Sequence, residues 1–237
     1  MQPSRSLGQL AWGAWNLLQL AFTLLWTATL CSLVLLLYVL GVPVARLLRM
    51  APRVWAPVLV AGAGARLVVE GGQDIDWSRP HLIVSNHQSV IDICALYMAV
   101  PVPRRFLLTD EMRKVPFVYW YARATGMLFL DRDSRRAGGI VRRQAAALLA
   151  AGQTLCLFPE GRLRLSRAVA PDMACLLPGA LDGGLPWTPS GLVVCGTVRP
   201  PRGLSRGRPG TIRLRTATPL DPHQPGDPLD RQALTQR

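Results

Sequence analysis

Lysine is almost absent from this sequence, since Lys114 is the only lysine among 27 Lys+Arg residues. Acidic residues are also few, 14 Asp+Glu, and the formal net charge is therefore +13. Half of the 237 residues are hydrophobic. This composition excludes an intrinsically disordered chain and a purely polar nucleic-acid-binding arm. The length allows one large domain, or one domain with an appendage.

Closely spaced metal ligands and cysteine pairs are missing as well. No two of the three histidines lie within five residues of each other, and no C-x-x-C pair occurs among the five cysteines, Cys31, Cys94, Cys156, Cys175 and Cys195. The sequence therefore predicts neither a disulfide framework nor a zinc site, and we expect no metal. We interpret the cysteines as small core residues in a reducing compartment.

Charge is absent between Arg5 and Arg46. The apolar run from Leu17 to Val44 exceeds the roughly 20 residues that cross a bilayer as a helix. It is too long for the hydrophobic region of a secretory signal peptide, which has about 7–15 residues. The run predicts a retained membrane helix or a tight helical hairpin, with a buried core helix as the alternative. The arginines that follow predict a body on the cytoplasmic face of the membrane, the inner membrane if the protein is bacterial.

After Arg66, short β-forming runs alternate with helical stretches, which predicts an α/β fold with a central, mostly parallel sheet flanked by helices. Residues 1–60 are predicted to be a membrane-anchoring helical segment and residues 61–237 a catalytic domain. The expected strands are Leu67–Val69, Leu82–Ser85, Phe106–Leu108, Met127–Leu130, Leu155–Phe158, Leu192–Gly196 and Thr211–Thr216. The expected helices are Val90–Met98, Pro116–Ala124 and Arg135–Ala150.

The segment NHQSVID, Asn86–Asp92, directly follows an apolar strand. Five steps of about 100° would separate His87 from Asp92 on a regular helix, so the useful geometry is a strand-to-helix turn. There the carboxylate can accept a hydrogen bond from one ring nitrogen and leave the other as a base. Alternatively, Ser85, Asn86 and Ser89 are helix-capping residues, and the segment is an ordinary helix start.

Three further segments end or precede apolar strands. FPEG, Phe158–Gly161, places a carboxylate in a rigid turn and is followed by several arginines, whose planar fork suits phosphate. GMLFLDR, Gly126–Arg132, brings Arg132 to the same sheet edge if the strands are parallel. GLPWTPSG, Gly184–Gly191, is predicted to be a rigid turn. The alternative for FPEG is a capped turn with a solvated basic loop.

In this order the segments resemble the glycerolipid acyltransferase family, which includes 1-acyl-glycerol-3-phosphate and other lysophospholipid acyltransferases. The family's NHxxxxD block is matched in full, and its FPEG block is matched as far as Gly161. The block of glycine, hydrophobic pair, Asp and Arg is matched by Gly126 and Phe129–Arg132. A fourth, Pro-containing block is matched loosely at Pro186 and Pro189. The resemblance covers about residues 66–220.

The resemblance implies that His87 deprotonates an acceptor hydroxyl while Asp92 orients the imidazole and stabilises its charge. The hydroxyl then attacks an acyl thioester directly, and acyl-CoA or acyl carrier protein is the co-substrate, with no cofactor. The substrate-binding residues implied are Asn86, Arg132, Glu160, Gly161, Arg162 and Arg164. The partners implied are membrane lipids and a lysolipid acceptor, in phospholipid biosynthesis.

The acceptor expected first is 1-acyl-glycerol-3-phosphate, giving phosphatidic acid. Two departures weaken this expectation: Arg162–Arg164 stand where many members have Thr-Arg-Ser, and Thr109 stands where a lysine is common. Because Arg162 after FPEG resembles the branch that acylates lysophosphatidylethanolamine, that lipid and lyso-ornithine lipid are alternative acceptors. Two other classes stay open: a basic nucleic-acid-binding protein and an inactive, lipid-binding family member.

Overall fold

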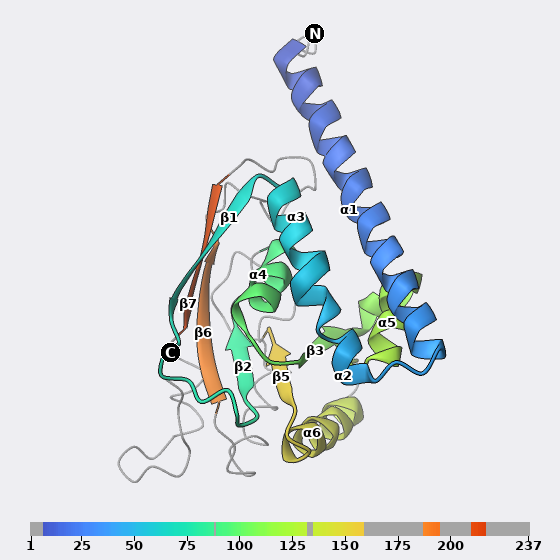
Figure 1. Cartoon of the computed structure of the whole chain (residues 1–237), viewed down its shortest axis with the longest axis vertical. Coiled ribbons are helices and arrows are strands. Elements are labelled where there is room, and N and C mark those ends of the chain that lie inside the picture. The colour runs from blue at the N-terminus through green and yellow to red at the C-terminus, as the bar shows by residue number, and fades with distance from the viewer. Residues whose placement is uncertain (1–6, 88, 132–134, 159–186, 195–209, 217–237) are drawn as a thin grey trace.

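The computed structural model describes residues 7–87, 89–131, 135–158, 187–194 and 210–216 (Figure 1). The helices are α1 Leu7–Val39, α2 Val44–Leu47, the π-helix η1 Ala51–Trp55, α3 Ala56–Gly62, α4 Ile91–Ala99, the 3-10 helix η2 Asp110–Lys114, α5 Pro116–Ala124 and α6 Arg135–Ala150. The strands are β1 Ala65–Gly71, β2 Leu82–Ser85, β3 Arg104–Thr109, β4 Leu128–Leu130, β5 Thr154–Leu157, β6 Trp187–Val194 and β7 Gly210–Thr216.

The strands form one sheet in the order β1-β7-β6-β2-β5-β3-β4. Every neighbouring pair is parallel except β6 and β7. The α/β fold with a mostly parallel sheet is therefore confirmed. The two strands that precede the NHQSVID and FPEG segments, β2 and β5, are direct neighbours, with Val84 opposite Leu157. Both chain segments consequently leave the sheet at the same edge.

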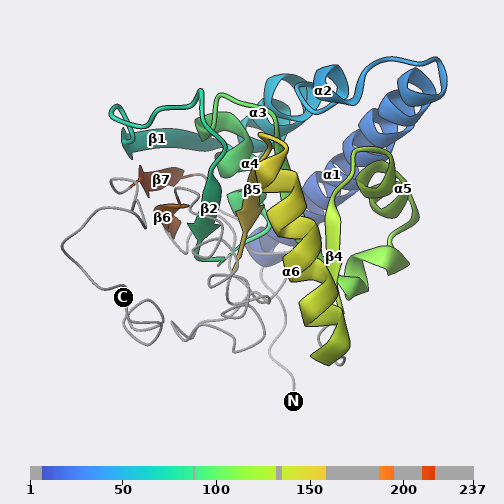
Figure 2. The ribbon, with the colours of Figure 1, turned by 90° about the horizontal axis from the view of Figure 1, so that it is seen from below.

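Both faces of the central strands β2, β3 and β5 are buried. Neighbouring side chains along each strand point to opposite faces, so they enter two separate clusters. Ile83, Phe106 and Cys156 pack into one cluster with residues of α1, α3 and α4. The adjacent Leu82, Leu107 and Leu155 pack on the other face with residues of α6. Figure 2 shows α6 on the opposite side of the strands from α1. Helices thus cover both faces of the sheet around β2, β3 and β5, whereas Arg213 and Arg215 of β7 are exposed.

Three of the cysteines, Cys31, Cys94 and Cys156, are buried free thiols. Burial raises the pKa of the Cys156 thiol to about 12, so this thiol stays protonated at neutral pH. The interpretation as core residues is confirmed for these three. Cys175 and Cys195 lie outside the described residues.

The apolar N-terminal segment forms one 33-residue helix, α1. It ends in a left-handed turn: Gly41 has φ +81°, its N–H donates to the carbonyl of Tyr38, and Val42 N–H donates to that of Leu37. This pattern satisfies the last carbonyls of a helix and reverses the chain. The chain then returns through α2, η1 and α3 to the sheet (Figure 1).

The N-terminal helices share a core with the sheet. Leu30 and Val34 of α1 and Leu59 of α3 belong to the same buried cluster as Cys94 and Phe106. The division of the chain near residue 60 stays a prediction.

One expectation about the C-terminal strands is wrong. Residues Gly184–Gly191 were predicted to form a turn before a strand at Leu192–Gly196, but β6 already begins at Trp187. Pro189 is opposite Val84 of β2, and the pairing with β7 starts one residue later, at Ser190. A proline is tolerated there because the strand is bonded on only one side.

A substitution pair tests the end of the β1–β7 ladder. Gly71 and Gly152 both have left-handed backbones, but a Cβ at Gly71 would clash with the Thr216 carbonyl oxygen, whereas one at Gly152 meets nothing within 4 Å. We expect Gly152→Ala to lower the free energy of unfolding by about 1 kcal/mol through backbone strain alone, and Gly71→Ala by about 2–3 kcal/mol. Denaturant unfolding measures both. Equal losses would contradict the close approach of β7.

Candidate active site

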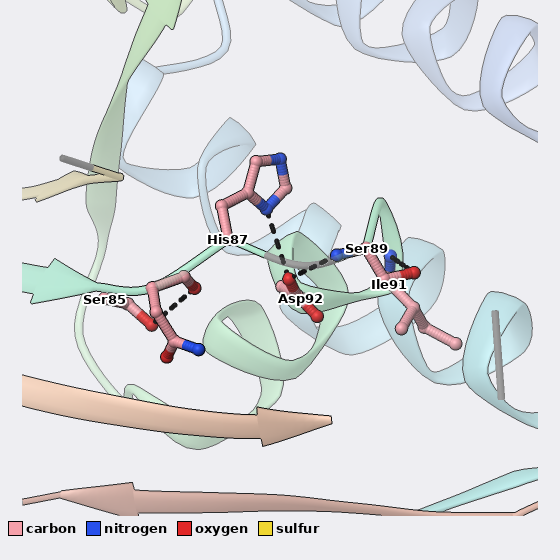
Figure 3. Close-up of polar contacts among 6 residues, drawn as sticks. Ser85, His87, Ser89, Ile91 and Asp92 are labelled. Atoms are coloured by element: carbon pink, nitrogen blue, oxygen red, sulfur yellow. Dashed lines mark hydrogen bonds and ion pairs between the residues drawn. The ribbon is translucent and has the colours of Figure 1, made fainter. Parts of the chain in front are cut away.

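The NHQSVID segment forms the turn between β2, which ends at Ser85, and α4, which begins at Ile91. His87 lies in this turn, and Asp92 is the second residue of the helix. The Nδ1 atom of His87 is 3.2 Å from Oδ2 of Asp92 (Figure 3). The two side chains therefore meet across a strand-to-helix turn, as their spacing predicts.

Asp92 is completely buried, with 0% of its surface exposed. A buried carboxylate needs hydrogen bonds to offset its lost hydration. One comes from the backbone N–H of Ser89, 2.7 Å from Oδ2, in addition to the contact with His87. The charge also lies in the first turn of α4, where the helix dipole favours an anion. These contacts fix the orientation of the carboxylate.

The alternative interpretation of this segment as an ordinary helix start is confirmed in part. The N-cap residue of α4 is Val90, which provides no side-chain cap, while the hydroxyl of Ser89 accepts a long bond, 3.5 Å, from Ile91 N–H. The segment thus starts a helix and also holds the two side chains together.

The His87 ring is oriented by the carboxylate and remains accessible, since 14% of its side chain is exposed. An ionised carboxylate only accepts hydrogen bonds, so we assign the proton of this contact to Nδ1. The Nε2 atom then keeps its lone pair, and Figure 3 shows this nitrogen turned away from Asp92. A partly exposed imidazole that is held in one tautomer can act as a general base through Nε2.

Phe158 supports the imidazole from the neighbouring strand. Its ring stacks on His87 with centroids 4.2 Å apart and planes at 22°, and Phe106 stacks behind it at 6.2 Å. Phe158 directly follows β5, and it is 7% exposed. The sequence showed Phe158 as the first residue of FPEG, but this contact depends on the pairing of β2 with β5 and was missed.

The other predicted site residues are placed only in part. Asn86 is half-buried beside His87, and its carbonyl accepts a 3.3 Å bond from the Ser85 hydroxyl. The parallel strand β4 ends at Leu130 on the same sheet edge. The remaining five lie outside the described residues, and their roles stay predictions: Arg132, Glu160, Gly161, Arg162 and Arg164.

No group of three His, Cys, Asp or Glu side chains able to hold a metal ion occurs among the described residues. The fold and the site together define an α/β protein with a His–Asp pair at the carboxyl edge of parallel strands, where binding sites of such sheets form. The family model described as Acyltransferase matches residues 66–193, more than half of the chain. The chain belongs to this family.

Several curated proteins are similar to the chain. The 1-acyl-sn-glycerol-3-phosphate acyltransferase of Neisseria gonorrhoeae is 29% identical over 132 residues, 54% of this chain and 51% of that protein. The lyso-ornithine lipid O-acyltransferase of Rhizobium meliloti is 30% identical over 145 residues, 61% of this chain and 48% of that protein. The chain thus spans about half the length of these relatives.

A solved structure has the same fold. The crystal structure of the 1-acyl-sn-glycerophosphate (LPA) acyltransferase PlsC from Thermotoga maritima superposes with a TM-score of 0.70. The match covers 93% of each chain at 24% sequence identity. At this identity the likeness establishes the fold.

The packing of the buried Phe158 ring beside His87 can be tested by measuring the free energy of unfolding. We expect Phe158→Ala to lower the free energy of unfolding by about 3–5 kcal/mol, because a buried ring is lost, and Phe158→Leu by about 1–1.5 kcal/mol. Phe117→Ala is the control, since Phe117 is 42% exposed. Denaturant unfolding in detergent measures all three. A loss for Phe158→Ala no larger than the control's would contradict the packing.

Proposed function

We propose that the protein is an O-acyltransferase that moves a fatty acyl group from a thioester, acyl-CoA or acyl carrier protein, to the free hydroxyl of a lysolipid. The observation that carries the proposal is the contact of His87 Nδ1 with the buried Asp92 carboxylate, 3.2 Å, in a chain of the Acyltransferase family. A lipid hydroxyl is a weak nucleophile, and a base of this kind can take its proton as it attacks.

In the proposed reaction, Nε2 of His87 takes the hydroxyl proton as the oxygen attacks the thioester carbonyl carbon. The new C–O bond gives a tetrahedral intermediate, which collapses by breaking the C–S bond. The imidazolium then gives its proton to the departing thiolate. Asp92 stabilises the transient positive charge through Nδ1, and the Phe158 ring limits rotation of the imidazole.

The remaining binding roles rest on the resemblance. Arg132, Arg162 and Arg164 would hold the acceptor headgroup, and Glu160 and Gly161 would also help to hold the acceptor. Guanidinium groups suit this task, because their planar fork pairs with phosphate or carboxylate oxygens. Asn86, next to His87 in the turn, would also bind substrate.

The acceptor proposed first is 1-acyl-glycerol-3-phosphate, which would give phosphatidic acid. The similarity to relatives named for this activity supports it, and so does the PlsC-like fold. Lyso-ornithine lipid is the second candidate, because a relative with that name is equally similar to the chain. Lysophosphatidylethanolamine is the third, on the strength of Arg162 after FPEG.

We also propose that α1 attaches the enzyme to the cytoplasmic face of a membrane. Among the described residues, one helix, Ala11–Val39, is long and apolar enough to cross a bilayer. An 18-residue window of this helix has a mean hydropathy of 2.2, and 17% of the window is buried. So little burial argues against a soluble core helix. The formal charge of +13 suits an anionic lipid surface, where each basic side chain adds about 1 kcal/mol of attraction.

A competing route through an acyl-enzyme deserves a direct test. Gly203–Gly207 reads G-L-S-R-G, which has the letters of a nucleophile elbow, G-x-S-x-G. The nucleophile of an elbow is followed directly by a helix, whereas the strand β7 begins at Gly210, only five residues after Ser205. We therefore assign Ser205 no part in the transfer.

Substitutions distinguish the two routes. We expect His87→Ala to lower kcat about 10²–10⁴-fold through loss of the general base, and Asp92→Asn, which keeps the side-chain shape, to lower it about 10²-fold. Ser205→Ala should transfer as well as wild type. Transfer of labelled acyl groups from acyl-CoA is the measurement. Undiminished transfer by His87→Ala, or a loss confined to Ser205→Ala, would overturn the direct mechanism.

The acceptor is tested with purified protein and a panel of lysolipids, each supplied with acyl-CoA and with acyl carrier protein thioesters. We expect 1-acyl-glycerol-3-phosphate to give the highest kcat/KM, because three candidate arginines match its phosphate monoester. A preference for lyso-ornithine lipid or lysophosphatidylethanolamine would replace this acceptor without affecting the His87 chemistry.

A further inference from the structure

Helix α1 is fastened to the body along much of its length. The amide of Gln19 donates to the Gly62 carbonyl at 2.9 Å, and the Trp55 indole N–H donates to the Thr27 hydroxyl at 3.0 Å. The 16 residues from Gln19 to Val34 correspond to about 24 Å of helix. If the exposed face of α1 lies in a lipid layer, the parts of the protein that flank Gln19–Val34 therefore also contact the lipids.

Helix α5 is one of these flanking parts. Leu30 and Val34 of α1 are buried in the same cluster as Tyr121 and Ala122 of α5, and Figures 1 and 2 both show the C-terminal half of α1 beside α5. Leu36, two residues after Val34, is 56% exposed and so lies on the outer side of α1. The exposed apolar side chains of α1 thus belong to a helix that packs directly against α5.

The outer face of α5 carries two large aromatic side chains. Phe117 is 42% exposed and Trp120 is 49% exposed, and their rings form a T-shaped pair with centroids 5.7 Å apart. Their spacing of three residues places them on one side of the helix, while Tyr121 and Ala122 face the core. Such a pair beside an apolar helix is typical of a membrane interface, where aromatic rings are favoured.

Basic side chains accompany this face. A hollow of about 260 Å³ beside α5 is lined by Arg113, Arg123, Met127, Leu128, Phe129 and Gln144. The guanidinium of Arg113, which also pairs with Asp110, lies 4.5 Å from the Phe129 ring centre, and that of Arg123 donates to the Tyr119 hydroxyl at 3.2 Å. Among the residues that the structure describes, two arginines and no acidic side chain line the hollow, which suits an anionic group.

We propose that α5 lies in the membrane interface beside α1, with Phe117 and Trp120 inserted among the lipids and with Arg113 and Arg123 at the level of anionic headgroups. The proposal rests on the membrane attachment through α1 proposed above. It adds a second contact from the enzyme's body, so the sheet is held at a defined angle to the bilayer. The occupant of this face is an anionic bilayer.

The test places a photoreactive benzoylphenylalanine at position 117 or 120 of the full chain. The chain is bound to vesicles of phosphatidylethanolamine and phosphatidylglycerol, irradiated and analysed by mass spectrometry for lipid adducts. Ile140, 48% exposed on α6, is the matched negative control, and Leu25, 69% exposed on α1, is the positive control. We expect at least about fivefold more adduct at positions 117 and 120 than at 140, and less when phosphatidylcholine replaces the anionic lipid.

Several outcomes would overturn the proposal. Adducts at position 25 but none above the control at 117 and 120 would leave α1 in the membrane and α5 outside it. Crosslinks between two chains from positions 117 and 120 would make this face an interface between copies. Failure of the chain to sediment with vesicles would refute the membrane attachment as well. Acyl transfer is assayed separately, so loss of that function leaves the crosslinking result intact.

Discussion

The parallel pairing of β2 with β5 is the constraint on which the site depends. Val84 stands opposite Leu157, so the residues that follow the two strands leave the sheet side by side. His87 comes from one strand and its aromatic support, Phe158, from the other. Segments some seventy residues apart in the chain therefore form one surface. The buried layers on both faces of the sheet keep this register, because a slip of one residue would turn leucines of the α6 layer toward the α1 layer.

The sequence predicts the parts of this arrangement that depend on interactions between residues close together in the chain. The five-residue spacing of His87 and Asp92 requires a strand-to-helix turn, and the bounds of β2, α5 and α6 follow from local periodicity and end signals. The contact of Phe158 with His87 could not be predicted in the same way, because it depends on which strands are neighbours. The early start of β6 was missed for a related reason: Pro189 normally ends a strand, and it is tolerated here because its other side is unpaired.

Asp92 combines a structural and a chemical requirement in one side chain. Its carboxylate accepts the Ser89 N–H at the start of α4, and this bond offsets part of the cost of full burial. The same oxygen faces Nδ1 of His87. An asparagine could keep the first contact but would lack the negative charge that stabilises an imidazolium. Replacement of Asp92 by asparagine would therefore affect the proposed catalysis more than folding, although the same oxygen atom makes both contacts.

The layer that supports the site is also the layer that carries α1. Phe158 belongs to the same buried cluster as Leu30 and Val34, whereas the α6 layer lies on the opposite face of the sheet. An imidazole stacked on Phe158 is thus joined to the apolar helix through one continuous packed core. In the proposed reaction, a lysolipid whose acyl chain stays in the interface beside α1 and α5 would need to present only its hydroxyl to His87. The distribution of charge along the sequence follows the same division: no charged residue lies between Arg5 and Arg46, and the arginines proposed to hold the headgroup follow β4 and β5 in the sequence.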